Sequence, residues 1–139
     1  MRIMIASAVT LLAFLALDVA WLAVFAAGLF KSQLGPLLRE QPNLFAAAAF
    51  YLIYVAGMVI LVVAPALPDA SPRATALRGA MLGLTAYATF DLTNLAIISG
   101  WTLAASLADL AWGTIATALT CVAAFYVGCS TMRMDGPRP

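Results

Sequence analysis

Residues 85–101 read TAYATFDLTNLAIISGW, and this stretch decides the fold. It is apolar enough for the interior of a membrane, yet Asp91 and Asn94 lie inside it with no lysine or arginine nearby. Its last three residues, 99–101, form a link so short that the helices on either side must form a tight antiparallel pair. The stretch therefore predicts a helical hairpin in a membrane, with a carboxyl group in its apolar part.

The composition of the whole chain also indicates a membrane protein. Of 139 residues, 65% are hydrophobic and 9% are charged, and the mean hydropathy is +1.03. Soluble domains carry about 25% charged residues, so this chain cannot cover a water-exposed surface. The net charge of +1 provides no basic surface of the kind that nucleic-acid binding requires. We therefore expect an integral membrane protein, with no nucleic acid among its partners.

Four apolar runs are each long enough for the roughly 20 residues that cross a bilayer. The predicted fold class is all-α, a bundle of four transmembrane helices in a single domain that covers residues 1–139. Pro65 is expected to end the second helix, and Ser71 followed by Pro72 is a favourable cap and first turn for the third. The predicted helices span approximately residues 3–30, 44–64, 77–98 and 102–128.

The basic residues are unevenly distributed between the two sides of this bundle. Five arginines fall on the side of the N-terminus, whereas only Lys31 and Arg39 fall on the other side. Because cytoplasmic loops carry an excess of Lys and Arg, we expect both termini in the cytoplasm. The first apolar run is longer than the roughly 7–15 residues of a signal-peptide core, so it is expected to remain in the protein.

Three aspartates interrupt the apolar runs, and they are expected at similar depths. Asp18 lies in the first predicted helix, Asp91 in the third and Asp109 in the fourth. At 1.5 Å per residue, all three lie roughly 12–18 Å below the helix ends on the non-cytoplasmic side, and Tyr51 in the second helix lies at the same level. Helices that run in alternating directions therefore bring their polar residues to one level.

Helical spacing predicts which side chains accompany these acids, because residues three and four positions apart share a helix face. Asp18 shares a face with Trp21, and a second copy of the same D-x-A-W pattern places Asp109 beside Trp112. The other candidates are tyrosines and an asparagine on the second and third helices. The candidate ligand- or ion-binding residues are Asp18, Trp21, Tyr51, Tyr54, Tyr87, Asp91, Asn94, Asp109 and Trp112.

Three carboxyl groups in apolar helices are too costly to remain unpaired on the lipid face. Each costs about 2.5–3.5 kcal/mol at the centre of a membrane helix before it finds partners, so all three should point inward. The sequence contains no histidine, and its one lysine and its arginines lie at helix ends. Either some of the acids are protonated, or a cation lies between them. In a structural alternative, the acids, amides and phenols only hydrogen-bond the helices together.

The absence of histidine narrows the chemistry further. It excludes Ser-His-Asp and Cys-His catalysis and histidine-ligated haem, and two cysteines cannot hold an iron–sulfur cluster. No cofactor is predicted. If a metal binds, its ligands would be Asp18, Asp91 and Asp109, whose oxygens favour a hard divalent cation such as Ca²⁺, Mg²⁺ or Mn²⁺.

Three further features have structural interpretations. Gly79 and Gly83 are interpreted as a close contact between helices rather than as a binding loop. Trp101 is interpreted as part of the aromatic belt at the membrane surface. Cys121 and Cys129 lie eight residues apart on one predicted helix, about 12 Å along its axis, so they cannot form a disulfide with each other.

The segments that carry the candidate residues resemble a known family. They are LDVAW (17–21), PNLFAAAAFYLIYVAG (42–57), TAYATFDLTNLAIISGW (85–101) and ADLAWGTIATAL (108–119). Together they resemble the bacterial domain-of-unknown-function 2177 membrane proteins, over nearly the whole chain. The resemblance implies a multi-pass, four-helix protein of the bacterial inner (cytoplasmic) membrane, and it implies no activity.

Three functions are consistent with the sequence. The leading hypothesis is a small transporter or ligand-binding membrane protein whose acidic and aromatic cluster takes a proton, a cation or a small cationic molecule. The alternatives are a non-catalytic accessory subunit of a larger membrane complex, and a membrane enzyme that acts on a lipid or isoprenoid. The sequence favours a non-enzymatic function. The expected partners are the lipid bilayer, such a ligand, and either further copies of the chain or a larger complex.

Overall fold

The computed structural model describes residues 2–35, 39–69 and 71–134, and in these ranges all regular secondary structure is helical. The predicted all-α fold is therefore confirmed, although both ends of the predicted domain, residues 1 and 139, lie outside the described ranges. In chain order the elements are α1 (Arg2–Trp21), the π-helical segment η1 (Leu22–Ala26), α2 (Ala27–Leu34), α3 (Leu44–Met58), the π-helical segment η3 (Val59–Val63), α4 (Ala64–Asp69), α5 (Pro72–Ile97) and α6 (Leu103–Met134).

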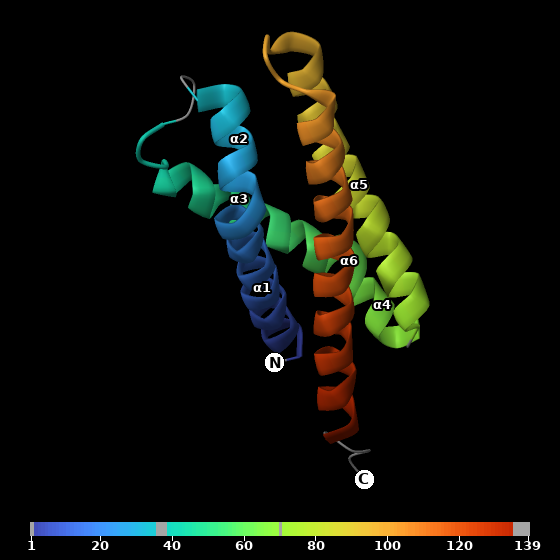
Figure 1. Cartoon of the computed structure of the whole chain (residues 1–139). Helices are drawn as coiled ribbons and strands as arrows, with labels where there is room; N and C mark the ends of the chain where they lie inside the picture. The colour runs from blue at the N-terminus through green and yellow to red at the C-terminus, as the bar shows by residue number, and fades with distance from the viewer. Residues whose placement is uncertain (1, 36–38, 70, 135–139) are drawn as a thin grey trace.

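The elements form four helical segments that run back and forth between two ends of the molecule (Figure 1). The first segment is α1 with η1 and α2, the second is α3 with η3 and α4, and the others are α5 and α6. Helix α6 is central, because α1 packs along one side of it and α5 along another. Helix α3 crosses α1 obliquely, and α1 begins and α6 ends at the end of the molecule opposite the α5–α6 turn (Figure 1).

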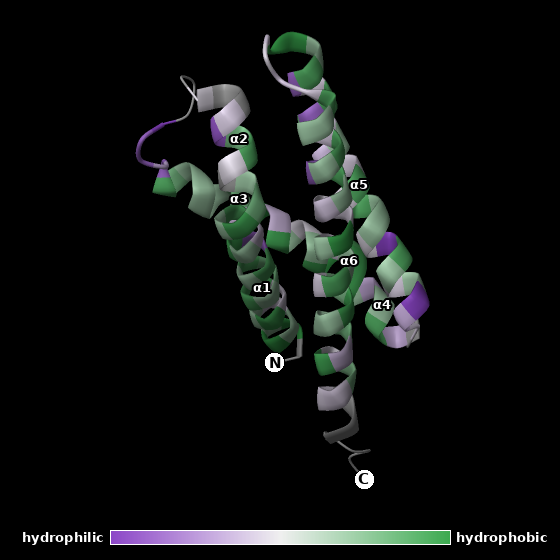
Figure 2. Ribbon diagram, in the orientation of Figure 1, coloured by the Kyte–Doolittle hydropathy of each residue, from purple (hydrophilic) through white to green (hydrophobic). Residues whose placement is uncertain are grey.

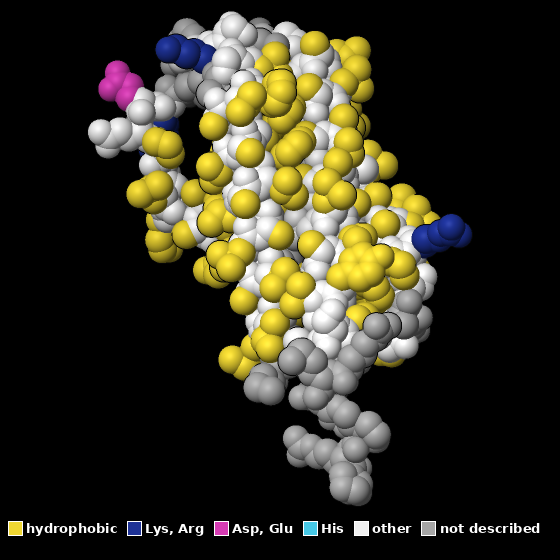
Figure 3. Space-filling view, turned by 60° about the horizontal axis from the view of Figure 1, so that its bottom comes forward, with side chains coloured by type: hydrophobic (Ala, Val, Ile, Leu, Met, Phe, Trp, Pro, Cys, Tyr) yellow, Lys and Arg dark blue, Asp and Glu magenta, His cyan; other side chains and the backbone are white. Residues whose placement is uncertain are grey.

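Three of these segments are long and apolar enough to cross a membrane: Ile3–Ala26, Leu44–Pro68 and Leu103–Thr131. Helix α5, at 26 residues, is long enough but is not among them, since Asp91, Asn94 and several threonines interrupt its apolar sequence. Hydrophilic residues gather in the connection between α2 and α3 and near the start of α5 (Figure 2). Hydrophobic side chains cover most of the face seen in Figure 3, as expected of a surface in contact with lipid.

The second segment does not end at Pro65, and this prediction was wrong, because the helix continues to Asp69. A proline in an α-helix lacks an amide donor, and its ring collides with the carbonyl group four residues earlier. Here the preceding turn is π-helical, and the amide of Ala64 bonds to the carbonyl of Val59, five residues earlier. This wider turn gives the proline ring room, so the helix continues past it.

The α5–α6 hairpin follows its sequence signals closely. The Ser71 side chain caps α5 by accepting a hydrogen bond from the Ala74 amide at 3.3 Å, and Pro72 lies in the first turn, as predicted. At the other end, α5 stops at Ile97. Gly100 then adopts a φ of 93°, which glycine reaches without steric cost, and the chain reverses into α6.

Small residues let α5 and α6 pack closely, which confirms the interpretation of Gly79 and Gly83. A methyl group added at Gly79 would lie 3.0 Å from the Cα of Ala118, and one at Gly83 would collide with the backbone of Gly113. Both cysteines are free thiols, and Cys121 is buried in this contact. The close approach lets the Tyr87 ring of α5 pack directly against Gly113 of α6.

Candidate functional site

A cavity of about 630 Å³ lies between α1 and the α5–α6 hairpin, and α3 contributes part of its wall. This volume is within the range of sites that hold small molecules. Asp18 and Asp109 are the only charged side chains among the described residues that line it. The rest of the wall is largely aromatic, with Trp21, Phe30, Phe50, Tyr54, Tyr87, Phe90 and Trp101.

Asp18 is held in place by the contact between α1 and α3. It lies one turn after Phe14, which is fully buried and packs against the rings of Tyr51 and Tyr54 at centroid distances of 6.2 and 5.1 Å. This packing brings the Tyr51 hydroxyl within 2.6 Å of an Asp18 carboxyl oxygen, to which it donates a hydrogen bond. Asp18 itself is only 9% exposed, so a group in the cavity meets a carboxyl whose position is already fixed.

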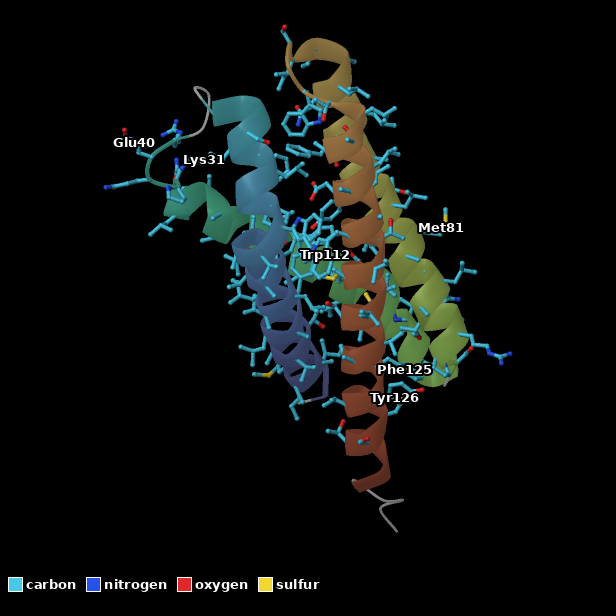
Figure 4. The ribbon with its side chains drawn as sticks, in the orientation of Figure 1. Lys31, Glu40, Met81, Trp112, Phe125 and Tyr126 are labelled. Atoms are coloured by element: carbon cyan, nitrogen blue, oxygen red, sulfur yellow. The ribbon has the colours of Figure 1, made fainter. Side chains whose placement is uncertain are left out.

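Asp109 is held by the contact between α1 and α6. The indole N–H of Trp21 donates a hydrogen bond to Asp109 at 3.2 Å. Trp112 projects from α6 toward α1 (Figure 4), and its ring stacks on that of Trp21 with centroids 5.0 Å apart. The two D-x-A-W patterns of the sequence therefore meet, since the tryptophan of one bonds the aspartate of the other.

Asp91 lies behind the cavity wall rather than in it. It is 0% exposed, and neither of its carboxyl oxygens has a hydrogen-bond partner among the described residues. Its side chain interacts electrostatically with Asp109 and lies near the indole of Trp101, but neither group has the distance and angle of a hydrogen bond. The three aspartates therefore differ, because Tyr51 and Trp21 supply donors to the other two, whereas the described part of the chain supplies none to Asp91.

Tyr54 and Tyr87 complete the inner wall. The Thr117 hydroxyl donates to the carbonyl of Gly113, so Tyr54 must be the donor in its 2.8 Å hydrogen bond to Thr117. The ring of Tyr87 occupies the space beside Gly113 where any other residue would place its Cβ. The two tyrosine rings meet edge to face at a centroid distance of 6.3 Å.

The sequence-predicted residues are thus largely brought together. Five of them line the cavity: Asp18, Trp21, Tyr54, Tyr87 and Asp109. Tyr51, Trp112 and Asp91 lie directly behind these residues and contact them. Asn94 is half-buried on α5, and it is not among the residues that line the cavity.

Part of the aromatic wall was not predicted from the sequence. Phe50 lies four residues before Tyr54, and Phe90 three after Tyr87, so helical spacing alone could have identified both. Trp101 was assigned to the aromatic belt, but it lines the cavity, and its N–H donates to Ser106 at 2.9 Å. Phe30 carries no such signal, because its position depends on η1 and α2 continuing the first helix.

Three aromatic residues of the cavity wall, Phe30, Phe90 and Trp101, contact one another. The ring centroid of Trp101 lies 5.7 Å from the ring centroid of Phe30 and 5.6 Å from that of Phe90. They link α2, the hairpin turn and α5 at one end of the site. Among the described residues, no three His, Cys, Asp or Glu side chains are grouped so that they could hold a metal ion. The carboxyl groups of Asp18 and Asp109 therefore offer separate contacts to a ligand, and the wall around them is largely aromatic.

Comparison with known proteins supports one family. The model of the domain-of-unknown-function 2177 family, described as a predicted membrane protein, matches residues 3–126. No curated protein and no solved structure matches the chain. The family match reaches from the start of the first helical segment into α6, as far as residue 126, and it includes every residue of the candidate site. The chain therefore belongs to the domain-of-unknown-function 2177 family of predicted membrane proteins.

Proposed function

We propose that this membrane protein binds a small organic cation in the cavity, as a ligand-binding or transport protein. The observation that carries the proposal is the pair Asp18 and Asp109, which face an aromatic cavity that no described basic side chain lines. Each of these acids accepts a hydrogen bond from an aromatic side chain, which offsets part of the cost of burying a carboxylate. Buried charges are normally paired, and here the cation would come from the ligand.

The aromatic wall favours an organic cation over a hydrated metal ion. A cation above an aromatic ring gains about 0.5–1 kcal/mol at exposed sites and about 2 kcal/mol when desolvated. Tyr87 and Trp101 offer such rings in the wall that also contains the two acids. A compact ligand with a quaternary or protonated amine and an apolar body would suit both the acids and the aromatic rings of the cavity.

We further propose that the chain crosses the bacterial inner membrane four times, with both termini in the cytoplasm. The five-to-two distribution of basic residues supports this orientation, although Arg138 lies outside the described residues. Helix α5 would be the fourth span. Its close pairing with α6 places Tyr87 and Asp91 against protein rather than lipid, which offsets its lower apolar content.

The test is direct binding by purified full-length protein in detergent. The probe is benzyltrimethylammonium, and neopentylbenzene is its uncharged analogue of the same shape. Because Trp21, Trp101 and Trp112 all belong to the site, their fluorescence reports binding. We expect a saturable change with the cation and little with the neutral analogue.

Variants then assign the binding to the cavity. Asp18→Asn and Asp109→Asn should each weaken binding about tenfold or more, equivalent to about 1.4 kcal/mol. Glu40→Gln is the matched control, because it removes one negative charge from an exposed residue near the α2–α3 connection, away from Trp112 (Figure 4). Equal binding of the neutral analogue, or unchanged affinity in both aspartate variants, would contradict the proposal.

A further inference from the structure

We infer that Asp91 holds a proton at neutral pH and releases it when a cation binds beside Asp109, so that the site exchanges one proton for one cation. The exchange rests on the proposed function, whereas the protonated state of Asp91 rests on the geometry of Asp91 alone. The two parts are therefore tested separately below.

The protonated state follows from the position of Asp91. The side chain is 0% exposed, and both of its oxygens lack a hydrogen-bond donor among the described residues. A buried carboxylate without water or donors loses several kcal/mol of solvation, and the usual response is to take up a proton. Asp18 and Asp109 have donors in Tyr51 and Trp21, so Asp91 is the acid of the three that needs the proton.

The groups around Asp91 show where the proton can go. Among the described residues, the titratable side chains of the site are acids and phenols: Asp18 on α1, Tyr51 and Tyr54 on α3, Tyr87 on α5 and Asp109 on α6. Helix α5 also carries Arg73 and Arg78, and α6 carries Cys121, each about three turns or more along its helix from Asp91 or Asp109. Asp109 interacts with Asp91 on one side and lines the cavity on the other. A protonated Asp91 whose side chain turns toward Asp109 can donate its O–H to that carboxylate, and the two acids then share one proton.

Cation binding changes the protonation of the Asp91–Asp109 pair. Without a ligand, one proton holds the pair at a single negative charge. A cation beside Asp109 supplies a positive charge in place of the proton, so the O–H bond of Asp91 breaks and the proton leaves through Asp109 into the cavity. One positive charge enters and one leaves, so the net charge buried in the membrane stays constant and no co-reactant is needed.

Proton release is measured in weakly buffered detergent solution with a pH-indicator dye, during titration with benzyltrimethylammonium. We expect about one proton released per cation bound near pH 7, together with an affinity that falls up to tenfold for each pH unit of acidification. Asp91→Asn should abolish both the release and the pH dependence, whereas Glu40→Gln should keep both. Cation binding by the wild type without proton release would overturn the exchange.

Infrared spectroscopy tests the protonated state without any ligand. The wild type should show a protonated-carboxyl stretch at neutral pH that is absent from Asp91→Asn and retained in Asp18→Asn. If this band is found and no cation binds, the proposed function fails and the proton site stands. If the wild type lacks the band, the inference about Asp91 is wrong, and this result does not depend on whether any variant folds.

Discussion

Trp21 and Trp112 stack with their ring planes 6° from parallel, and this contact joins α1 to α6 at the wall of the cavity. The two indoles differ in their polar contacts. The N–H of Trp21 bonds to Asp109, whereas the N–H of Trp112 is buried without a partner among the described residues. The two tryptophans therefore have different roles, since Trp21 orients Asp109 and Trp112 supports the ring of Trp21.

The first prediction compares Trp21→Phe with Trp112→Phe. Both keep an aromatic ring in the stack, but only Trp21→Phe removes a donor from a carboxylate, which costs about 1.5–3 kcal/mol. Trp112→Phe removes a buried N–H that already lacks a partner, so its cost should be clearly smaller. The free energy of unfolding in detergent, measured for both variants, checks this. An equal or larger loss in Trp112→Phe would show that the hydrogen bond to Asp109 is not what distinguishes the two rings.

A second prediction compares Tyr51→Phe with Tyr54→Phe. The Tyr51 hydroxyl donates to Asp18, so its removal leaves a buried carboxyl without its donor and should weaken cation binding about tenfold. The Tyr54 hydroxyl bonds to Thr117, which is not a wall residue of the cavity. Tyr54→Phe should therefore cost about 0.5–1.5 kcal/mol of stability and change the affinity little. Titrations with benzyltrimethylammonium distinguish the two, and similar affinities in both variants would contradict the role given to Tyr51.

The sequence predicts contacts within one helix better than contacts between helices. Pairs such as Asp18 and Trp21 were found because residues three or four apart share a helix face. The common depth of the acids follows from helix length and alternating direction. The aspartate that lacks a donor among the described residues could not be identified, because the donors to Asp18 and Asp109 come from side chains on other helices.

The errors have the same physical origin. Pro65 was expected to end a helix, since the π-helical turn that accommodates it has no simple sequence signal. Trp101 was interpreted only as a residue of the aromatic belt because of its place beside a turn, so its part in the cavity wall was missed. Local rules therefore predicted the helices and their polar faces, and the contacts between helices decided which residues form the wall.

A third prediction concerns the packing of the hairpin. Gly113→Ala would place a methyl group into the ring of Tyr87, which forms part of the cavity wall. Gly57→Ala is the matched control, because nothing lies within 4 Å of a methyl group at Gly57. We expect the unfolding temperature in detergent to fall for Gly113→Ala, since overpacking typically costs about 1–3 kcal/mol. It should stay constant or rise for Gly57→Ala, since alanine favours helix by about 1 kcal/mol over glycine. A tolerated Gly113→Ala would mean that α5 and α6 pack less closely than described.

The last prediction concerns orientation. Ser32 in α2 and Ser99 in the hairpin turn are exposed at one end of the molecule, and Arg73 at the start of α5 is exposed near the other end, where α1 begins and α6 ends. Single cysteines at these positions, in a background with Cys121 and Cys129 replaced by alanine, can be labelled with a membrane-impermeant maleimide in whole cells. If both termini are cytoplasmic, Ser32→Cys and Ser99→Cys should react from outside, and Arg73→Cys only after the membrane is opened. Because Arg73→Cys removes one basic charge from the cytoplasmic side, Ala74→Cys provides a second test at the same end. Labelling of Ser99→Cys with the opposite accessibility to Ser32→Cys would mean that α5 and α6 do not cross as a pair, and a full reversal of all positions would place the termini outside.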